Sequence, residues 1–258
     1  MSEKTAPAAL PVKTRHPWLV ASAAAGCAAC LCLCFFLCLY LFFKPCGRGP
    51  VPVSAPAPAA RPQSGGDNFA CTAADAHKII CAGVNGRGQL GTGFSSGPGQ
   101  HILRAEGVRL IASGSDFTCF SPGRGVSCFG DNRWRQAGDS DTQIMPVSPL
   151  PFFKGRRVES LTAGSVHACA LTGGSVFCWG SDYAGQMGSG KQGGEAGGIR
   201  RIVLPKSAGR PVAVSAFSFA TCVLTDKHRS VCFGSNADKT LSGSDAQYLP
   251  PTVARKAQ

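Results

Sequence analysis

Eight cysteines in the C-terminal part of this 258-residue chain form pairs with a regular spacing. In each pair the second cysteine follows nine or ten positions after the first, and a Gly lies two positions beyond it. Thiols in such pairs could form disulfides, hold zinc or stay reduced as small buried apolar residues. The pairs are Cys71 and Cys81, Cys119 and Cys128, Cys169 and Cys178, and Cys222 and Cys232.

The residues between the cysteines predict how each pair meets. If Gly173-Gly174 form a two-residue hairpin loop, a common choice for primed turns, Cys169 faces Cys178. The two cysteines then form a non-hydrogen-bonded pair with Cα atoms about 4.5 Å apart, which a disulfide can bridge. Cys119 and Cys128 are expected to face each other in the same way around Gly123-Arg124.

The pairs that are ten positions apart contain one more residue in the expected turn. Their loops would be Asp75-Ala76-His77 and Asp226-Lys227-His228. Because the spacing follows the turn length in all four units, we predict four cross-strand disulfides, each worth roughly 2–3 kcal/mol. Reduced core cysteines remain an alternative, whereas zinc is disfavoured because no unit offers a Cys-x-x-Cys with a second matching pair.

The cysteine pairs mark four copies of one sequence unit, with a period of about 47–54 residues. Each copy reads as an apolar strand, a tight turn, a second apolar strand and a Gly-rich turn. Further strand candidates lie between the copies at 108–111, 158–161 and 212–214. Three or four short strands per unit are what a propeller blade needs.

Two of the copies carry a set of Gly, Gln and aromatic residues at matching positions. This pattern resembles the regulator of chromosome condensation (RCC-type) repeat, with its Gly-x-x-His strand start, hairpin, Trp-Gly-x-Asn and Gly-Gln-Leu-Gly. The resemblance covers residues 66–258 and implies a β-propeller-like fold of stacked blades, without fixing a function. The matching residues are Gly164, His167, Leu171, Trp179, Gly180, Gly185, Gln186 and Gly188, and Asn85, Gly88, Gln89, Leu90 and Gly91.

The chain also departs from that family. Its best-known members have seven repeats and act on a small nuclear GTPase on chromatin, whereas this chain has about four repeats. Cysteine-paired membrane and secreted relatives, such as the ectodomains of crinkly-type plant receptor kinases, look more similar. The fourth copy is degraded, because Phe217 replaces the glycine found at Gly114 and Gly164.

The N-terminal part divides into a short cytosolic tail (1–17), an uncharged apolar run of 26 residues (18–43) and a Pro/Ala/Gly-rich linker (44–65). About 20 apolar residues cross a bilayer as a helix, so 18–43 is predicted to be a transmembrane anchor. A cleaved signal peptide and a buried helix are the alternatives. The prolines of the linker favour an extended tether.

The disulfides decide the expected orientation. Lys and Arg are nearly balanced on the two sides of the apolar run. Disulfides require an oxidising compartment, so the C-terminal domain is expected to be extracellular, lumenal or periplasmic. Cys46 is left for an intermolecular disulfide or a free thiol. The five cysteines inside the run are expected to be small packing residues; they are Cys27, Cys30, Cys32, Cys34 and Cys38.

No residue pattern predicts an enzyme, a cofactor or a metal site. Hydrolase, kinase and nucleotide-binding motifs are absent from the sequence, and the family resemblance makes His167 a structural strand-start residue. The acidic residues Asp131, Asp182 and Asp226 lie mostly in expected turns.

The net charge of +12 is the remaining functional signal. Residues 66–258 carry 20 Lys and Arg against 13 Asp and Glu. Arginines in the expected loops at the propeller rim could meet an acidic protein, an anionic glycan or lipid headgroups, or could form a solvated surface. Nucleic acid is not expected, since no aromatic-basic platform is evident. These arginines are Arg133, Arg135, Arg156, Arg157, Arg200, Arg201 and Arg210.

The sequence therefore predicts an all-β, RCC-type β-propeller-like domain of about four blades, preceded by one transmembrane helix. The expected function is a single-pass membrane protein that displays this domain for protein or ligand binding. An intracellular adaptor or guanine-nucleotide exchange regulator, tethered to an organelle membrane, is the alternative. Two arrangements stay open: the tail from Tyr248 completes the first blade and closes the ring, or an open arc is completed by a partner chain. Self-association also stays open.

Overall fold

The computed structural model describes residues 61–194, 197–237, 239, 241–242 and 245–254. The expected N-terminal tail, the apolar run 18–43 with its five cysteines, and Cys46 lie outside these residues. Within the described part, no helix has the length and apolar character needed to span a membrane.

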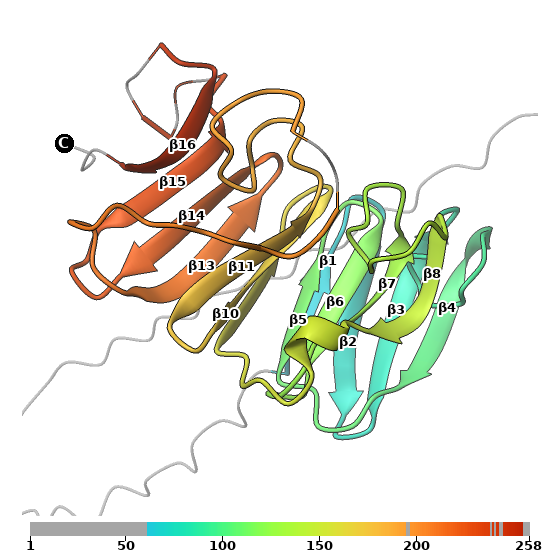
Figure 1. Cartoon of the computed structure of the whole chain (residues 1–258). Helices are drawn as coiled ribbons and strands as arrows, with labels where there is room; N and C mark the ends of the chain where they lie inside the picture. The colour runs from blue at the N-terminus through green and yellow to red at the C-terminus, as the bar shows by residue number, and fades with distance from the viewer. Residues whose placement is uncertain (1–60, 195–196, 238, 240, 243–244, 255–258) are drawn as a thin grey trace, which may run out of the picture. The chain divides into compact units, whose positions relative to one another are not determined.

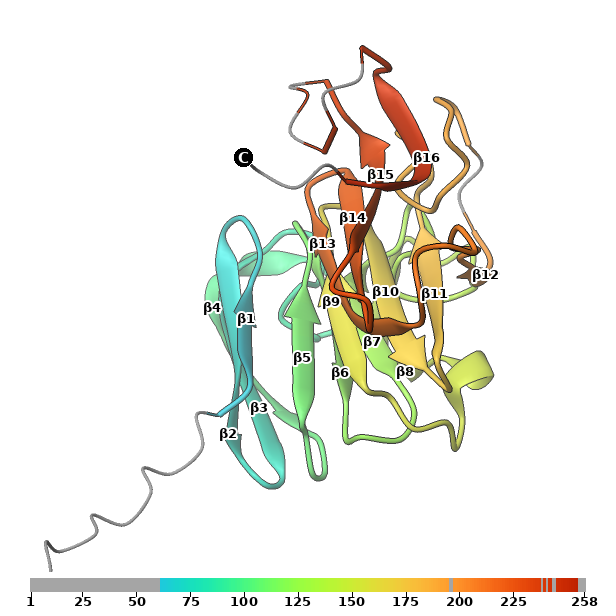
Figure 2. The same cartoon turned by 90° about the vertical axis from the view of Figure 1, so that its left-hand side faces the viewer.

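The described residues form four antiparallel sheets of four strands each, which follow one another along the chain (Figure 1). The first strands of successive sheets lie side by side (Figure 2). This arrangement confirms the predicted all-β, propeller-like fold with four blades. Blade one has β1 (Gln63–Gly65), β2 (Phe69–Asp75), β3 (Lys78–Asn85) and β4 (Ser96–Arg104); blade two has β5 (Leu110–Ser113), β6 (Phe117–Ser121), β7 (Ser127–Asp131) and β8 (Ile144–Pro149). Blade three has β9 (Ser160–Ala163), β10 (His167–Thr172), β11 (Ser175–Gly180) and β12 (Arg200–Arg201), after the short 3-10 helix η1 (Pro151–Phe153); blade four has β13 (Pro211–Phe217), β14 (Ala220–Thr225), β15 (Ser230–Ser235) and β16 (Tyr248–Val253).

The β10–β11 hairpin has the predicted register. Cys169 pairs with Cys178, and Thr172 pairs with Ser175 on either side of the two-residue turn. Gly173 and Gly174 both have positive φ, 55° and 67°, as a type I′ turn requires.

The turn of the hairpin in blade two differs from the prediction. In blade two the ladder ends at Phe120 and Ser127, so the turn is wider than the expected two-residue loop at Gly123-Arg124. Its main chain instead bonds to the segment before β9, where Val158 N donates to Gly123 O at 2.9 Å. The shape of this turn is therefore set by a contact with another segment of the chain and not by its own residues alone.

The additional residue in blades one and four is accommodated in two different ways. In blade four, Thr225 N donates to Arg229 O, which leaves the predicted three-residue loop with His228 at φ 55°. In blade one, Asp75 pairs with Lys78 and the register shifts between Ala73 and Asp75. The predicted three-residue loop is therefore wrong there, because a β-bulge in the strand absorbs the residue.

The structure joins all four predicted cysteine pairs, with Cα–Cα distances of 4.0–4.1 Å. In the first three blades both cysteines are completely buried. Each of these disulfides faces the next blade; Cys71 and Cys81, for example, pack with Phe120 and Phe129 of blade two. The disulfides thus contribute to the core between blades as well as bridging their own hairpins.

Main-chain hydrogen bonds connect each blade to the next near the start of the second strand. Ser115 N donates to Ser165 O at 3.0 Å, and Ser165 N donates to Ser218 O at 2.8 Å. Asp67 N makes the corresponding bond to Ser115 O at 3.4 Å. The same position is therefore used at all three junctions.

Glycine makes this close approach of the main chains possible. A Cβ on Gly114 would collide with the Phe117 ring and with the carbonyl oxygen of Gly164 in the next blade. Gly66 and Gly164 are confined in the same way. Phe217 occupies this position in blade four and is 45% exposed.

The C-terminal tail does not complete the first blade. Tyr248–Val253 forms β16, which pairs with β15 inside blade four. The missing first strand comes from Gln63–Gly65, which the sequence had assigned to the linker. Of the two arrangements left open by the sequence, ring closure by the tail is therefore ruled out, because each blade takes its four strands from contiguous sequence.

His167 is a fully buried part of the junction between blades three and four. Thr221 Oγ1 donates to Gln186 O at 3.0 Å, so it accepts from His167 Nε2–H, 2.8 Å away. Nδ1 has no partner among the described residues. Burial lowers the pKa of His167 to about 3, which keeps the ring neutral.

Substitution Gly114→Ala should destabilise the domain by about 1–3 kcal/mol, because the new methyl group has no room between the Phe117 ring and Gly164 O. Gly97→Ala is the matched control, since a Cβ at Gly97 would meet no atom within 4 Å. Urea unfolding of both variants checks this. Equal stability of the two variants would show that the junction is not closely packed.

Acidification should destabilise the domain through His167. Its folded pKa of about 3 lies below the unfolded value near 6.5, so its contribution is complete above pH 6.5 and declines as the pH falls toward 3. Between pH 7.5 and pH 5 we expect a loss of about 2 kcal/mol in the free energy of unfolding. Phe117 occupies the equivalent position in blade two. The substitution His167→Phe should therefore remove this dependence of stability on pH. Identical pH profiles for the variant and the parent would contradict the assignment.

Candidate functional site

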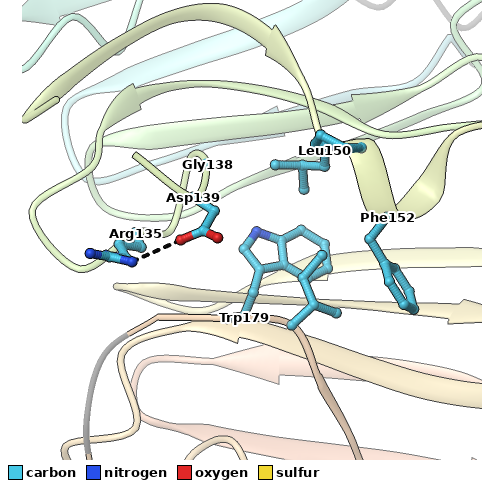
Figure 3. A pocket seen from close by; sticks show the side chains of 9 residues that line it. Arg135, Gly138, Asp139, Leu150, Phe152 and Trp179 are labelled. Atoms are coloured by element: carbon cyan, nitrogen blue, oxygen red, sulfur yellow. Dashed lines mark hydrogen bonds and ion pairs between the residues drawn. The ribbon is translucent and has the colours of Figure 1, made fainter. Parts of the chain in front are cut away.

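A pocket of about 290 Å³ opens between blades two and three (Figure 3). Three segments of the chain meet there: the turn between β7 and β8, the start of η1, and the segment that enters β12. Trp179, near the end of β11, supplies the floor. The lining residues are Arg135, Gly138, Asp139, Leu150, Pro151, Phe152, Trp179, Gly198 and Ile199.

The interior of the pocket is apolar. Trp179 is almost completely buried, and its ring centroid lies 5.2 Å from that of Phe153. Its indole N–H donates to Gln136 O at 2.9 Å, so the only polar atom of the floor already has a partner. Leu150, Phe152 and Ile199 complete the walls. Such a pocket is suited to an apolar side chain.

The rim of the pocket is polar, and one arginine there contacts two aspartates. Arg135 donates through Nη1 to Asp139 Oδ1 and through Nη2 to Asp141 Oδ1, both at 2.8 Å. Figure 3 shows the first of these contacts at the mouth of the pocket. The rim therefore offers hydrogen-bonding groups around an apolar interior without a net positive charge of its own.

Apart from Trp179, the family-type motif residues do not line the pocket, and the turns that follow the second cysteines share one hydrogen bond. One side-chain oxygen in each blade accepts from the main-chain N–H five residues later. Asp182 Oδ1, for example, accepts from Met187 N at 2.7 Å. The corresponding acceptors in the other blades are Asn85, Asn132 and Asn236, which bond to Leu90 N, Ala137 N and Leu241 N.

The acidic residues singled out in the sequence likewise have structural partners. Buried Asp131 accepts from Arg133 Nε and from Gln136 Nε2, both at 2.8 Å. Buried Asp182 accepts from Arg200 Nη1 at 2.8 Å. Hydrogen bonds from Arg210 hold the pKa of Asp226 below its usual value.

The seven arginines expected at a basic rim divide into two groups. Arg133, Arg135, Arg200 and Arg210 each make an ion pair with aspartate. Arg156, Arg157 and Arg201 have no ion pair within the described residues. Arg200 and Arg201 form strand β12 and not a loop. Four of the seven expected rim charges are therefore neutralised, and the positive charge is concentrated on the other three arginines.

Sequence reasoning missed most of the pocket. Trp179 was recognised only through the repeat motif, while Leu150, Phe152 and Ile199 belong to no motif. The only sequence signal is the unusual Pro151-Phe152-Phe153 run between two copies of the repeat. Phe152 contacts Phe153 and Phe177, with centroid distances of 5.0 and 4.8 Å, and these contacts fix the wall of the pocket.

Known proteins share both the sequence repeats and the fold. The X-linked retinitis pigmentosa GTPase regulator of Canis lupus familiaris is 34% identical over 131 residues, which are 48% of this chain and 13% of that protein. The Homo sapiens protein is 33% identical over the same length. The chain thus spans only a small part of these curated relatives. No protein-family model matches it.

Solved structures agree with this match. Human WBSCR16 superimposes with a TM-score of 0.63 at 18% identity, over 75% of this chain and 54% of that one. Prp20p from Saccharomyces cerevisiae, studied for its binding to Gsp1p and histones, gives 0.58 at 19% identity, over 74% of this chain and 50% of that one. The solved structures therefore show that the chain has an RCC1-like propeller fold, and the sequence match adds a resemblance over 48% of its length.

Proposed function

We propose that this chain is a binding protein whose repeat domain is displayed outside the cytosol by a single membrane span. The pocket between blades two and three carries this proposal. It combines an apolar interior with a polar rim, and Trp179 forms a rigid floor. The preferred ligand is an apolar side chain of a protein partner.

The cysteines support the location. Six of the eight lie completely buried within disulfides in the cores between blades, where they replace apolar side chains. Such bonds persist in the extracellular space, the secretory lumen or the periplasm. The uncharged run 18–43 supplies the proposed membrane span, with the N-terminal tail in the cytosol.

We propose binding and not catalysis, because the ionisable side chains with unusual environments already have structural tasks. His167 supports the junction between blades three and four, and Asp131 and Asp182 support turns. The pocket itself brings an aspartate only to its rim, where Arg135 neutralises it.

An intracellular regulator of a GTPase is the second candidate. It is favoured by the 34% identity to a protein named as a GTPase regulator. This function would place the domain in a reducing compartment, where the eight cysteines of the repeats would be thiols.

Alkylation of thiols in intact cells separates the two candidates. Cells that express the full chain are precipitated with acid, and the denatured proteins are then dissolved at neutral pH with N-ethylmaleimide. The cysteine peptides are weighed before and after reduction. We expect the eight repeat cysteines to escape labelling until a reductant is added. A reduced and denatured sample, in which all eight must react, is the control. Labelling without reductant would favour the intracellular regulator.

Substitution Ile199→Asp should abolish binding of an apolar side chain, because it places a carboxylate inside the pocket. The probe is N-acetyl-phenylalaninamide, followed by ligand-observed NMR with the purified full chain. We expect at least a tenfold weaker affinity. Val203→Asp is the control, since Val203 is 80% exposed and lies outside this pocket. Equal binding by the parent and both variants would contradict the proposed site.

A further inference from the structure

Five cations without carboxylate partners gather at one end of blade two. They come from the β4–β5 connection, the β6–β7 turn and the segment between η1 and β9. All five are exposed, and none makes an ion pair within the described part of the chain. This group, here called the turn cluster, consists of Arg109, Arg124, Lys154, Arg156 and Arg157.

Main-chain hydrogen bonds hold these three segments together. Arg109 N donates to Ser121 O at 2.9 Å, which attaches the β4–β5 connection to the hairpin. Gly125 N donates to Arg156 O at 3.0 Å, and Arg124 forms an isolated antiparallel bridge with Arg157. The turn cluster is therefore built on a connected backbone.

Two of its guanidinium groups are oriented by the protein. Arg124 Nη1 donates to Gly155 O at 3.0 Å. Arg156 Nε donates to Phe152 O at 2.8 Å, and its guanidinium carbon lies 4.4 Å from the centroid of the Phe152 ring. A guanidinium has five N–H donors, so each of these groups keeps donors for an anion.

A groove of about 620 Å³ lies directly beside the turn cluster. Arg124 and Lys154 line it together with the apolar side chains of Phe120, Val126 and Pro149. Glu106 is its only acidic lining residue, and this carboxylate contacts His77 Nδ1 at 2.6 Å. We call this hollow the basic groove.

The basic groove and the pocket share a wall. Leu150 and Pro151 line both hollows, on the two sides of the start of η1. Phe152 connects them as well, because it lines the pocket while its ring lies beneath the Arg156 guanidinium. One extended ligand could therefore occupy both hollows.

We propose that the basic groove binds an acidic polypeptide segment, whose neighbouring apolar side chain fills the pocket. This inference rests on the proposed function, because it assigns the partner class of the same site. A polypeptide places carboxylates and an apolar side chain at adjacent positions, which suits a cationic groove beside an apolar pocket. A sulfated polysaccharide provides the anions without the apolar side chain.

The test uses the purified full chain in detergent and a fluorescein-labelled heptapeptide, in which three Glu lie on either side of one Phe. Two matched peptides replace the Phe by Ala, or all Glu by Gln. We expect fluorescence anisotropy to show binding of the first peptide, and binding about tenfold weaker for each of the other two. Binding should also weaken as salt increases, because the contacts are exposed.

The double variant Arg124→Glu/Lys154→Glu should bind the first peptide at least tenfold more weakly than the parent does. Lys191→Glu/Lys206→Glu is the charge-matched control, since both lysines are exposed and lie outside the groove. In one contrary outcome, the groove variant binds the first peptide as tightly as the parent does, while the Ala-containing peptide still binds more weakly. That result would overturn this inference and leave the pocket function intact. No binding of any peptide, or tighter groove-dependent binding of heparin, which needs no apolar side chain, would overturn the acidic-segment proposal.

Discussion

Contact between main chains of neighbouring blades is the constraint on which this fold depends. At each junction a main-chain hydrogen bond joins two blades beside a glycine without space for a Cβ. The side chain three residues after that glycine lies over it, as Phe117 lies over Gly114. This geometry brings the sheets close enough to bury the disulfide of one blade in one cluster with the aromatic side chains of the next, as Cys71 and Cys81 are with Phe120 and Phe129.

The functional surfaces arise where the blades diverge from this contact. Toward the outer strands, the space between blades two and three is filled by η1, whose Phe153 is completely buried. The same short helix bounds the pocket through Phe152 and the basic groove through Pro151. One irregular segment between two regular blades therefore separates an apolar hollow from a cationic one.

The repeat pattern allowed the sequence to predict much of the fold, because period and register are local properties. The spacing of Cys169 and Cys178 around two glycines determined both the hairpin and the cysteine pairing. The same reasoning was wrong in blade one, where a bulge absorbed the additional residue. It also left the place of the C-terminal tail open, since a strand beside the first blade and one beside the fourth have the same local sequence character.

The sequence by itself determined the strand repeats, the cysteine register and the glycine positions, because each depends on residues a few positions apart in the chain. The tertiary structure alone decided which arginines keep a free charge and which are neutralised, as Arg135 is by Asp139. It also decided that Trp179, Leu150 and Ile199 meet in one pocket. These contacts join segments that are distant in sequence, and no short-range spacing encodes them.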